Sequence, residues 1–167
     1  YDGVMSTVAT DNVAAATEVA DKMAENMEQS GEIIVFAHDS KSLAALSRTN
    51  AFSDELKAKY PEVSVVDTYA MDQLEKMQQK IADEVNAGKY KLDGKEVVNS
   101  NDTDTDVDEE VVSAENQEKK EDTVADENLL QASDITEDEV VDYILAKHPN
   151  VKGIYATNSE SMELALN

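Results

Sequence analysis

Cysteine is absent from this chain of 167 residues, and only 14 residues are Lys or Arg against 37 Asp or Glu. Without cysteine, neither a disulfide framework nor a thiolate metal site can form. A formal net charge of −23 argues against direct contact with nucleic acid, because that affinity depends on Lys and Arg displacing counterions from phosphates. No apolar run approaches the roughly 18 residues that a membrane span needs, so we expect neither membrane insertion nor a signal peptide within the chain.

Glycine is also scarce, and the glycine-dependent catalytic motifs are missing. The five glycines form no G-x-S-x-G elbow, phosphate-binding loop or G-x-G-x-x-G turn. His38 stands beside Asp39 and could form an acid–base pair with it, but no nucleophile for that pair is identifiable. We therefore expect a binding protein with no catalytic residues, no cofactor and no metal.

Short apolar runs alternate with helical stripes along the chain, which is typical of parallel α/β units. The predicted strands are 4–8, 33–36, 63–66 and 151–156. The predicted helices carry apolar stripes within 13–27, 43–56, 71–85, 140–145 and 159–166. This order predicts a three-layer α-β-α fold with a mostly parallel, Rossmann-like sheet.

The expected helix ends follow from local signals. Gly31 and Gly88 are predicted to close the first and third helices as C-terminal glycines, and Ser40 or Ser42 to cap the second, which stops before Pro61. Residues 136–139 have the sequence of a capping box, and the helix that they open should end at His148-Pro149.

An acidic segment interrupts this pattern. Residues 93–139 hold 18 of the 37 acidic residues and only three basic ones, with few large apolar groups to bury. We predict a single α/β lobe over 1–167, with 93–133 as a flexible acidic insert and a small hairpin around Asp93-Gly94. Aspartates at 104, 106 and 108 suggest a calcium loop, but Glu109 stands where its sharp turn needs glycine, so a solvated loop is the better interpretation.

Polar side chains follow every predicted strand, and ligands bind at the carboxyl ends of strands in open parallel sheets. They are Thr10, Asp11, Asn12, His38, Asp39, Ser40, Thr68, Tyr69, Thr157, Asn158 and Ser159. The set suits a neutral polyhydroxylated ligand, although the same residue types also cap helices. Arg48, the only arginine, lies near this edge, where its five donors suit sugar hydroxyls or a carboxylate; a solvated arginine on a helix face is the alternative.

Three strings carry a resemblance to a known family: Thr-Val-Ala-Thr-Asp-Asn at 7–12, Ser-Arg-Thr-Asn-Ala-Phe at 47–52 and Lys-His-Pro-Asn-Val-Lys-Gly-Ile-Tyr-Ala-Thr-Asn at 147–158. The chain resembles the type I periplasmic binding proteins, which include ribose- and galactose-type sugar-binding proteins and the effector domains of lac-repressor-type regulators. The match covers about 4–90 and 135–167 and looks like the second lobe. Ala51 and Ser159 depart from the family's usual glycine and aspartate.

The resemblance implies that Arg48 and Asn158 bind a sugar or related polyol, and His38, Asp39, Tyr69 and Asp11 are further candidate contacts. It also implies hinge closure against a first lobe absent from this chain, with an ABC permease or a membrane sensor as partner. Such a protein would be extracytoplasmic, either periplasmic or a cell-surface lipoprotein. The alternatives are a cytoplasmic effector lobe of a lac-repressor-type transcription regulator and, with less support, an unrelated α/β enzyme domain.

Overall fold

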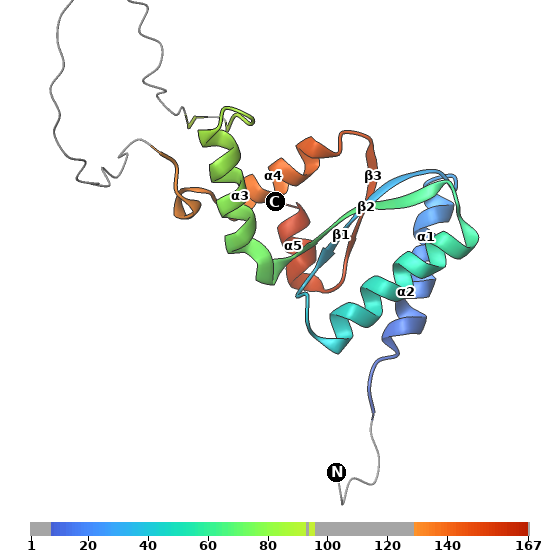
Figure 1. The fold of residues 1–167 in the computed structure, drawn as a ribbon. Coiled ribbons are helices and arrows are strands. Elements are labelled where there is room, and N and C mark those ends of the chain that lie inside the picture. The colour runs from blue at the N-terminus through green and yellow to red at the C-terminus, as the bar shows by residue number, and fades with distance from the viewer. Residues whose placement is uncertain (1–7, 93, 96–128, 167) are drawn as a thin grey trace, which may run out of the picture.

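The computed structural model describes residues 8–92, 94–95 and 129–166, and these contain a parallel sheet with helices on both faces (Figure 1). In chain order the elements are α1 (Asn12–Asn26), β1 (Gly31–Ala37), α2 (Leu43–Lys59), β2 (Val63–Ala70), the 3-10 helix η1 (Met71–Gln73), α3 (Leu74–Asn86), the 3-10 helix η2 (Ala132–Asp134), α4 (Glu137–Lys147), β3 (Val151–Ala156) and α5 (Ser159–Leu166). The predicted α-β-α class is confirmed.

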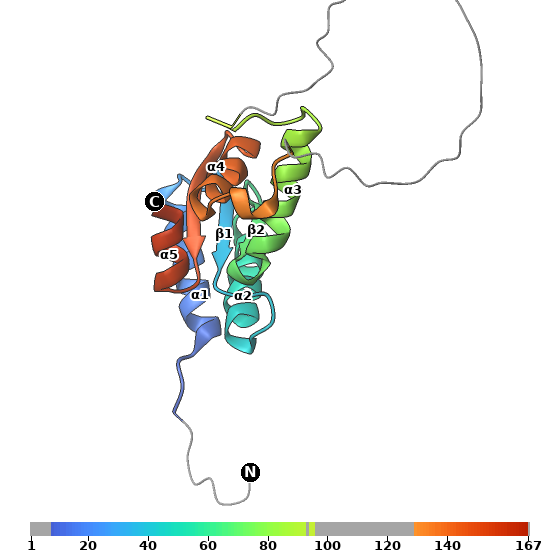
Figure 2. The same cartoon turned by 90° about the vertical axis from the view of Figure 1, so that its left-hand side faces the viewer.

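The described strands form a sheet in the order β2-β1-β3, with both pairs parallel. Side chains alternate along β1, so Ile33 and Val35 pack with α1 and α2, whereas Ile34 and Phe36 pack with α3, α4 and α5. Figure 1 shows the two helical layers on opposite sides of the sheet, and Figure 2 looks onto the face that α3, α4 and α5 cover. Because β1 is central and covered on both faces, its sequence is a continuous apolar run.

The segment from α4 to α5 follows the sequence signals closely. The Thr136 hydroxyl accepts from the Glu139 N–H at 3.2 Å, and the Glu139 carboxylate accepts from the Thr136 N–H at 2.7 Å. This is the predicted capping box, and it satisfies two donors that the first turn of a helix leaves open. His148 caps the other end of α4, and β3 and α5 have the predicted bounds.

The predicted C-terminal glycine of α1 is wrong. The helix ends at Asn26, and the chain then turns through Glu28 and Gln29, which have φ angles of 56° and 58°. Gly31 is instead the first residue of β1, with φ at 133°. L side chains rarely adopt this φ, and a Cβ at Gly31 would also lie 2.7 Å from Cδ of the Lys152 side chain, so glycine suits this position.

Helix α2 begins after Ser42, whose side chain accepts from the Ala45 N–H at 3.1 Å, as one of the two predicted caps. Phe52 and Leu56 are fully buried, as their stripe predicts. Leu43, the first residue of the predicted apolar stripe, is not buried with them, because 81% of its surface is exposed.

Several predicted features fall outside the described residues. These are the predicted strand 4–8, the second half of the hairpin, the calcium-like run and 96–128 of the acidic insert. Of the predicted strand only Val8 is described, and it is exposed. Of the hairpin, a single antiparallel bridge joins Leu92 to Lys95. Within the ranges that are described, no helix has the length and apolar character to cross a membrane.

Candidate functional site

The carboxyl ends of the three described strands meet at one edge of the sheet, because all three strands are parallel. Helices α2 and α5 start directly after β1 and β3, so their amino ends lie at this edge. The amino end of α1 lies there too, because Asn12 is bonded to Arg48, which is bonded in turn to the residue after β3. The candidate site is built from these loops and helix ends.

Arg48 joins three elements at this edge. From α2, its Nε–H donates to Oδ1 of Asn12 at 2.8 Å, and its Nη1 donates to the backbone oxygen of Thr157. Within the described residues no carboxylate forms an ion pair with this guanidinium. Because two acceptors fix its plane, the guanidinium is oriented before any ligand arrives, and its Nη2 donors make no bond within the described part of the chain.

An aromatic stack lies one helical turn from Arg48. The rings of Phe52 in α2 and Tyr155 in β3 are 4.1 Å apart and inclined by 16°. Both residues are buried, so their stacking packs α2, which carries Arg48, against β3, which precedes Thr157. Burial raises the pKa of Tyr155, and the Arg48 charge opposes that rise.

Thr157 is the junction between the ends of β1 and β3. Only 4% of its surface is exposed, and its N–H donates to the Phe36 oxygen at 2.9 Å. Its hydroxyl oxygen accepts from the His38 N–H at 3.0 Å and lies 2.7 Å from Nδ1 of the same residue. The His38 imidazole is therefore held by β3 although it belongs to the end of β1.

Asp39 organises the turn between β1 and α2. One of its carboxylate oxygens accepts from the backbone N–H groups of Lys41 and Ser42. Hydrogen bonds from the backbone and side chain of Ser42, with a further one from Lys41, lower the pKa of Asp39 to about 2. The other oxygen lies 3.4 Å from Nε2 of His38, which is also 3.3 Å from the Ser42 hydroxyl.

The loop after β2 is connected to the loop after β1 through Asp72 of η1. Its two carboxylate oxygens accept from the N–H and the hydroxyl of Ser40 at 2.9 and 2.8 Å. Lys41 also lies 3.7 Å from this carboxylate. The loops that follow β1 and β2 are thereby joined.

Asn158 and Asp11 both act as helix caps. The Asn158 side-chain oxygen accepts from the Ser161 N–H at 2.9 Å, which leaves its amide NH₂ unbonded within the described residues. Asp11 accepts from the Ala14 N–H at 3.0 Å at the start of α1. The helix-capping alternative therefore accounts for part of the polar pattern, and it does not exclude ligand contacts by the donors that stay free.

Tyr69 lies apart from the other candidates. Only 3% of its surface is exposed, and its ring packs edge-on against Phe36 at 5.8 Å in the core under α3 and α4. Burial, with the Glu137 and Asp72 charges, raises its pKa to about 12. Its hydroxyl has no hydrogen-bond partner among the described residues.

The structure thus brings together Arg48, His38 and Asp39 in one connected set of polar groups. Asn12 and Thr157 belong to the same set. The sequence pattern places both after predicted strands but does not single out either one as a ligand contact. Among residues 8–92, 94–95 and 129–166, no group of three or more His, Cys, Asp or Glu side chains could hold a metal ion.

The amino-acid sequence matches a known protein family. The sequence profile of a family described as "Periplasmic binding protein domain" matches residues 2–125. The chain belongs to this family. No curated protein sequence matches the chain.

Three solved structures share the fold of this periplasmic binding protein domain. A solute-binding protein of an ABC transporter from Burkholderia graminis, in complex with D-arabinose, has 17% identity and a TM-score of 0.51 over 95% of this chain and 35% of its own. A fructose-binding periplasmic domain of a hybrid two-component system has 14% identity and a TM-score of 0.53 over 99% and 35%. A solute-binding protein from Actinobacillus succinogenes, with bound D-allose, has 13% identity and a TM-score of 0.50 over 95% and 34%. The chain spans about a third of the length of these proteins.

Proposed function

We propose that this periplasmic binding protein domain is one lobe of an extracytoplasmic solute-binding protein that takes a sugar or related polyol. The observation that carries the proposal is Arg48, which is held by Asn12 and Thr157 at the carboxyl edge of the sheet and keeps free donors. Ligands of open α/β sheets bind at this edge. In this proposal the chain binds and releases its ligand without chemical change.

Within this site, Arg48 and the amide of Asn158 donate to ligand hydroxyl or ring oxygens, and the His38 imidazole adds a contact at the margin. Asp39 and Asp11 contribute indirectly. Their carboxylate oxygens already accept from backbone N–H groups at the start of α2 and α1. Tyr69 supports the edge from within the core. A first lobe of the same protein closes over the ligand by hinge motion, and the closed form is read by a partner.

That partner is, in our proposal, an ABC permease, because the similar proteins with bound D-arabinose and D-allose are solute-binding proteins of ABC transporters. A membrane sensor is the second candidate, since one relative is the periplasmic domain of a hybrid two-component system. Both uses need the same ligand site, so ligand binding is the step to test first.

The test is a titration of the ¹⁵N-labelled chain, followed by amide NMR shifts, with D-arabinose, D-allose, D-fructose and other sugars and polyols. Shifts report weak binding, which is expected for a lobe that supplies part of a clamp. Binding should move the amides of residues 157–159 and the Arg48 Nε–H, and Arg48→Ala should abolish it. Lys22→Ala, which removes one exposed positive charge from the second half of α1, is the matched control and should bind normally. Shifts confined to other surfaces, or unchanged in Arg48→Ala, would overturn the proposed site.

A further inference from the structure

His38 occupies a position at which its protonation state controls the hydrogen bonds of another residue. The Thr157 hydroxyl oxygen already accepts from the His38 N–H at 3.0 Å, and the imidazole Nδ1 lies 2.7 Å away. A hydroxyl has one proton to donate. The arrangement that satisfies both groups has the Thr157 O–H donating to an unprotonated Nδ1, with the ring proton on Nε2.

The Nε2 side of the ring fits the same assignment. Nε2 lies 3.4 Å from Oδ2 of Asp39 and 3.3 Å from the Ser42 hydroxyl. A proton on Nε2 therefore faces a carboxylate and a hydroxyl, both of which accept hydrogen bonds. The neutral ring with the proton on Nε2 satisfies every contact that the structure gives it.

Adding a proton to Nδ1 breaks this pattern. The Nδ1–H would then donate to the Thr157 oxygen, and the hydroxyl proton would have to turn toward another acceptor. Thr157 is almost fully buried, and an unpaired polar group at such a place is destabilising. The backbone oxygen of Thr157 is one of the two acceptors that orient Arg48. A displacement of Thr157 would therefore change the orientation of the guanidinium.

Charged groups reach this corner from three elements. Asp39 faces Nε2 from the loop after β1, and it favours the protonated ring. Arg48 lies beyond Thr157 on α2, and it disfavours that form. Asp72 of η1 holds Ser40 and has Lys41 beside it at 3.7 Å, so its charge is partly compensated. Charged groups of both signs therefore lie around the His38 imidazole.

We propose that His38 is a positioning residue for Arg48, acting through Thr157, and that protonation of its imidazole weakens ligand binding. The part of this inference that concerns ligand binding rests on the proposed function. The response of Arg48 to pH can be measured without a ligand. For a bound sugar we expect affinity at pH 5.5 to be about fivefold weaker than at pH 7.5, which corresponds to the loss of one ordinary hydrogen bond.

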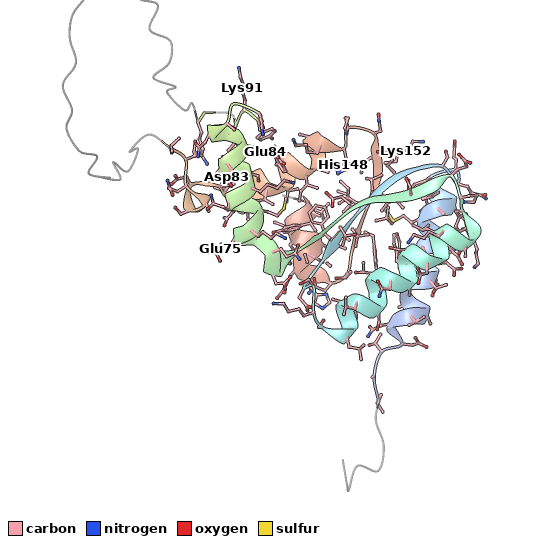
Figure 3. The ribbon with its side chains drawn as sticks, in the orientation of Figure 1. Glu75, Asp83, Glu84, Lys91, His148 and Lys152 are labelled. Carbon is pink, nitrogen blue, oxygen red and sulfur yellow. The ribbon has the colours of Figure 1, made fainter. Side chains whose placement is uncertain are left out.

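The chain offers a convenient probe, because Arg48 is its only arginine and gives a single Nε–H resonance. That resonance should shift between pH 8 and pH 5 along a single titration curve in the wild-type chain, and stay constant in His38→Gln. His148→Gln is the matched control, since His148 lies before the start of β3, away from the carboxyl ends of the strands (Figure 3), and its Nε2 is 3.3 Å from Asp67. Its removal should leave the Arg48 curve intact.

The inference would be overturned by an Arg48 resonance that does not respond to pH, or by the same titration curve in His38→Gln. Imidazole ¹⁵N shifts of the wild-type chain give a second test that needs no His38 variant, with His148→Gln used for assignment. Near pH 8, His38 should have its proton on Nε2, and a proton on Nδ1 would contradict the mechanism. Absence of binding by all sugars would count against the proposed function while leaving these pH measurements valid.

Discussion

At Gly153 the backbone of β3 lies directly against two methionine side chains, so a side chain at this position would have to displace them. A Cβ on this residue would lie 2.5 Å from Cε of Met23 and 3.1 Å from Sδ of Met27. Methionine side chains are flexible enough to fill such a space against bare backbone. The close contact helps to set how α1, and with it Asn12, is placed against the sheet.

Gly153→Ala should destabilise the chain by about 1 kcal/mol, at the low end for overpacking because the obstructing atoms end flexible side chains. Met23→Ala should relieve part of this cost, so the double variant should be more stable than the sum of the single changes predicts. Urea unfolding of all four proteins measures the cycle. Additive effects would show that Met23 is not what excludes a side chain at Gly153.

Tyr69 shows why some site residues could not be placed from sequence. Val65 packs with α1 and α2, and Tyr69, four residues later along β2, should lie on the same face by simple alternation. It packs on the opposite face, because β1 pairs Ile33 with Val65 and then Ile34 with Asp67, which leaves one extra residue in β2. Such an irregularity reverses the alternation, and nothing in the residue types announces it.

Among the elements, α4 was predictable and the end of α1 was not, and capping explains the difference. Thr136 and Glu139 satisfy each other's backbone groups, so their spacing specifies where α4 begins. The chain leaves α1 through Glu28 and Gln29 at positive φ, which these residue types rarely adopt and which local sequence does not signal. The sequence pattern therefore favours the nearest glycine, Gly31, as the helix end, although this residue begins β1.

Thr136→Ala should cost about 1 kcal/mol of stability, as the loss of a helix N-cap does. The effect should be larger than that of Ser133→Ala, an exposed hydroxyl just before the cap that serves as control. Thermal unfolding followed by circular dichroism measures both. Equal melting temperatures for the two variants would mean that the capping box does not stabilise α4.

At the scale of the whole chain, the two ends of the acidic segment are held together. The Asn86 amide donates to the Leu130 oxygen and accepts from the Leu130 N–H, both at 2.9 Å. The Lys95 ammonium lies 2.6 Å from the Glu139 carboxylate. These contacts lie beside α3, whose outer side carries Glu75 and Asp83 (Figure 3), whereas Arg48 lies in α2 on the other face of the sheet. Composition identified the segment, but it could not identify this anchoring, which depends on side chains on each side of it.

Replacing residues 96–128 with a linker of about eight Gly and Ser residues should preserve the fold. The shorter loop closes at a lower entropy cost, so the melting temperature should stay the same or rise by about 2–4 °C. A linker of the original length without charges separates the effect of length from that of charge. Calorimetry measures all three proteins, and a fall of more than about 4 °C would show that the segment stabilises the lobe.

The paired bonds between Asn86 and Leu130 also make this place suitable for protein engineering. The chain segments on the two sides of the insert meet at the Asn86 side chain. A foreign domain whose termini lie close together could therefore be inserted between them without disrupting the fold. A circularly permuted fluorescent protein placed at this point would be carried by α3 while leaving the Arg48 edge open. The lobe would then serve as the frame of an optical reporter, with its recognition surface and its signal on separate parts of the molecule.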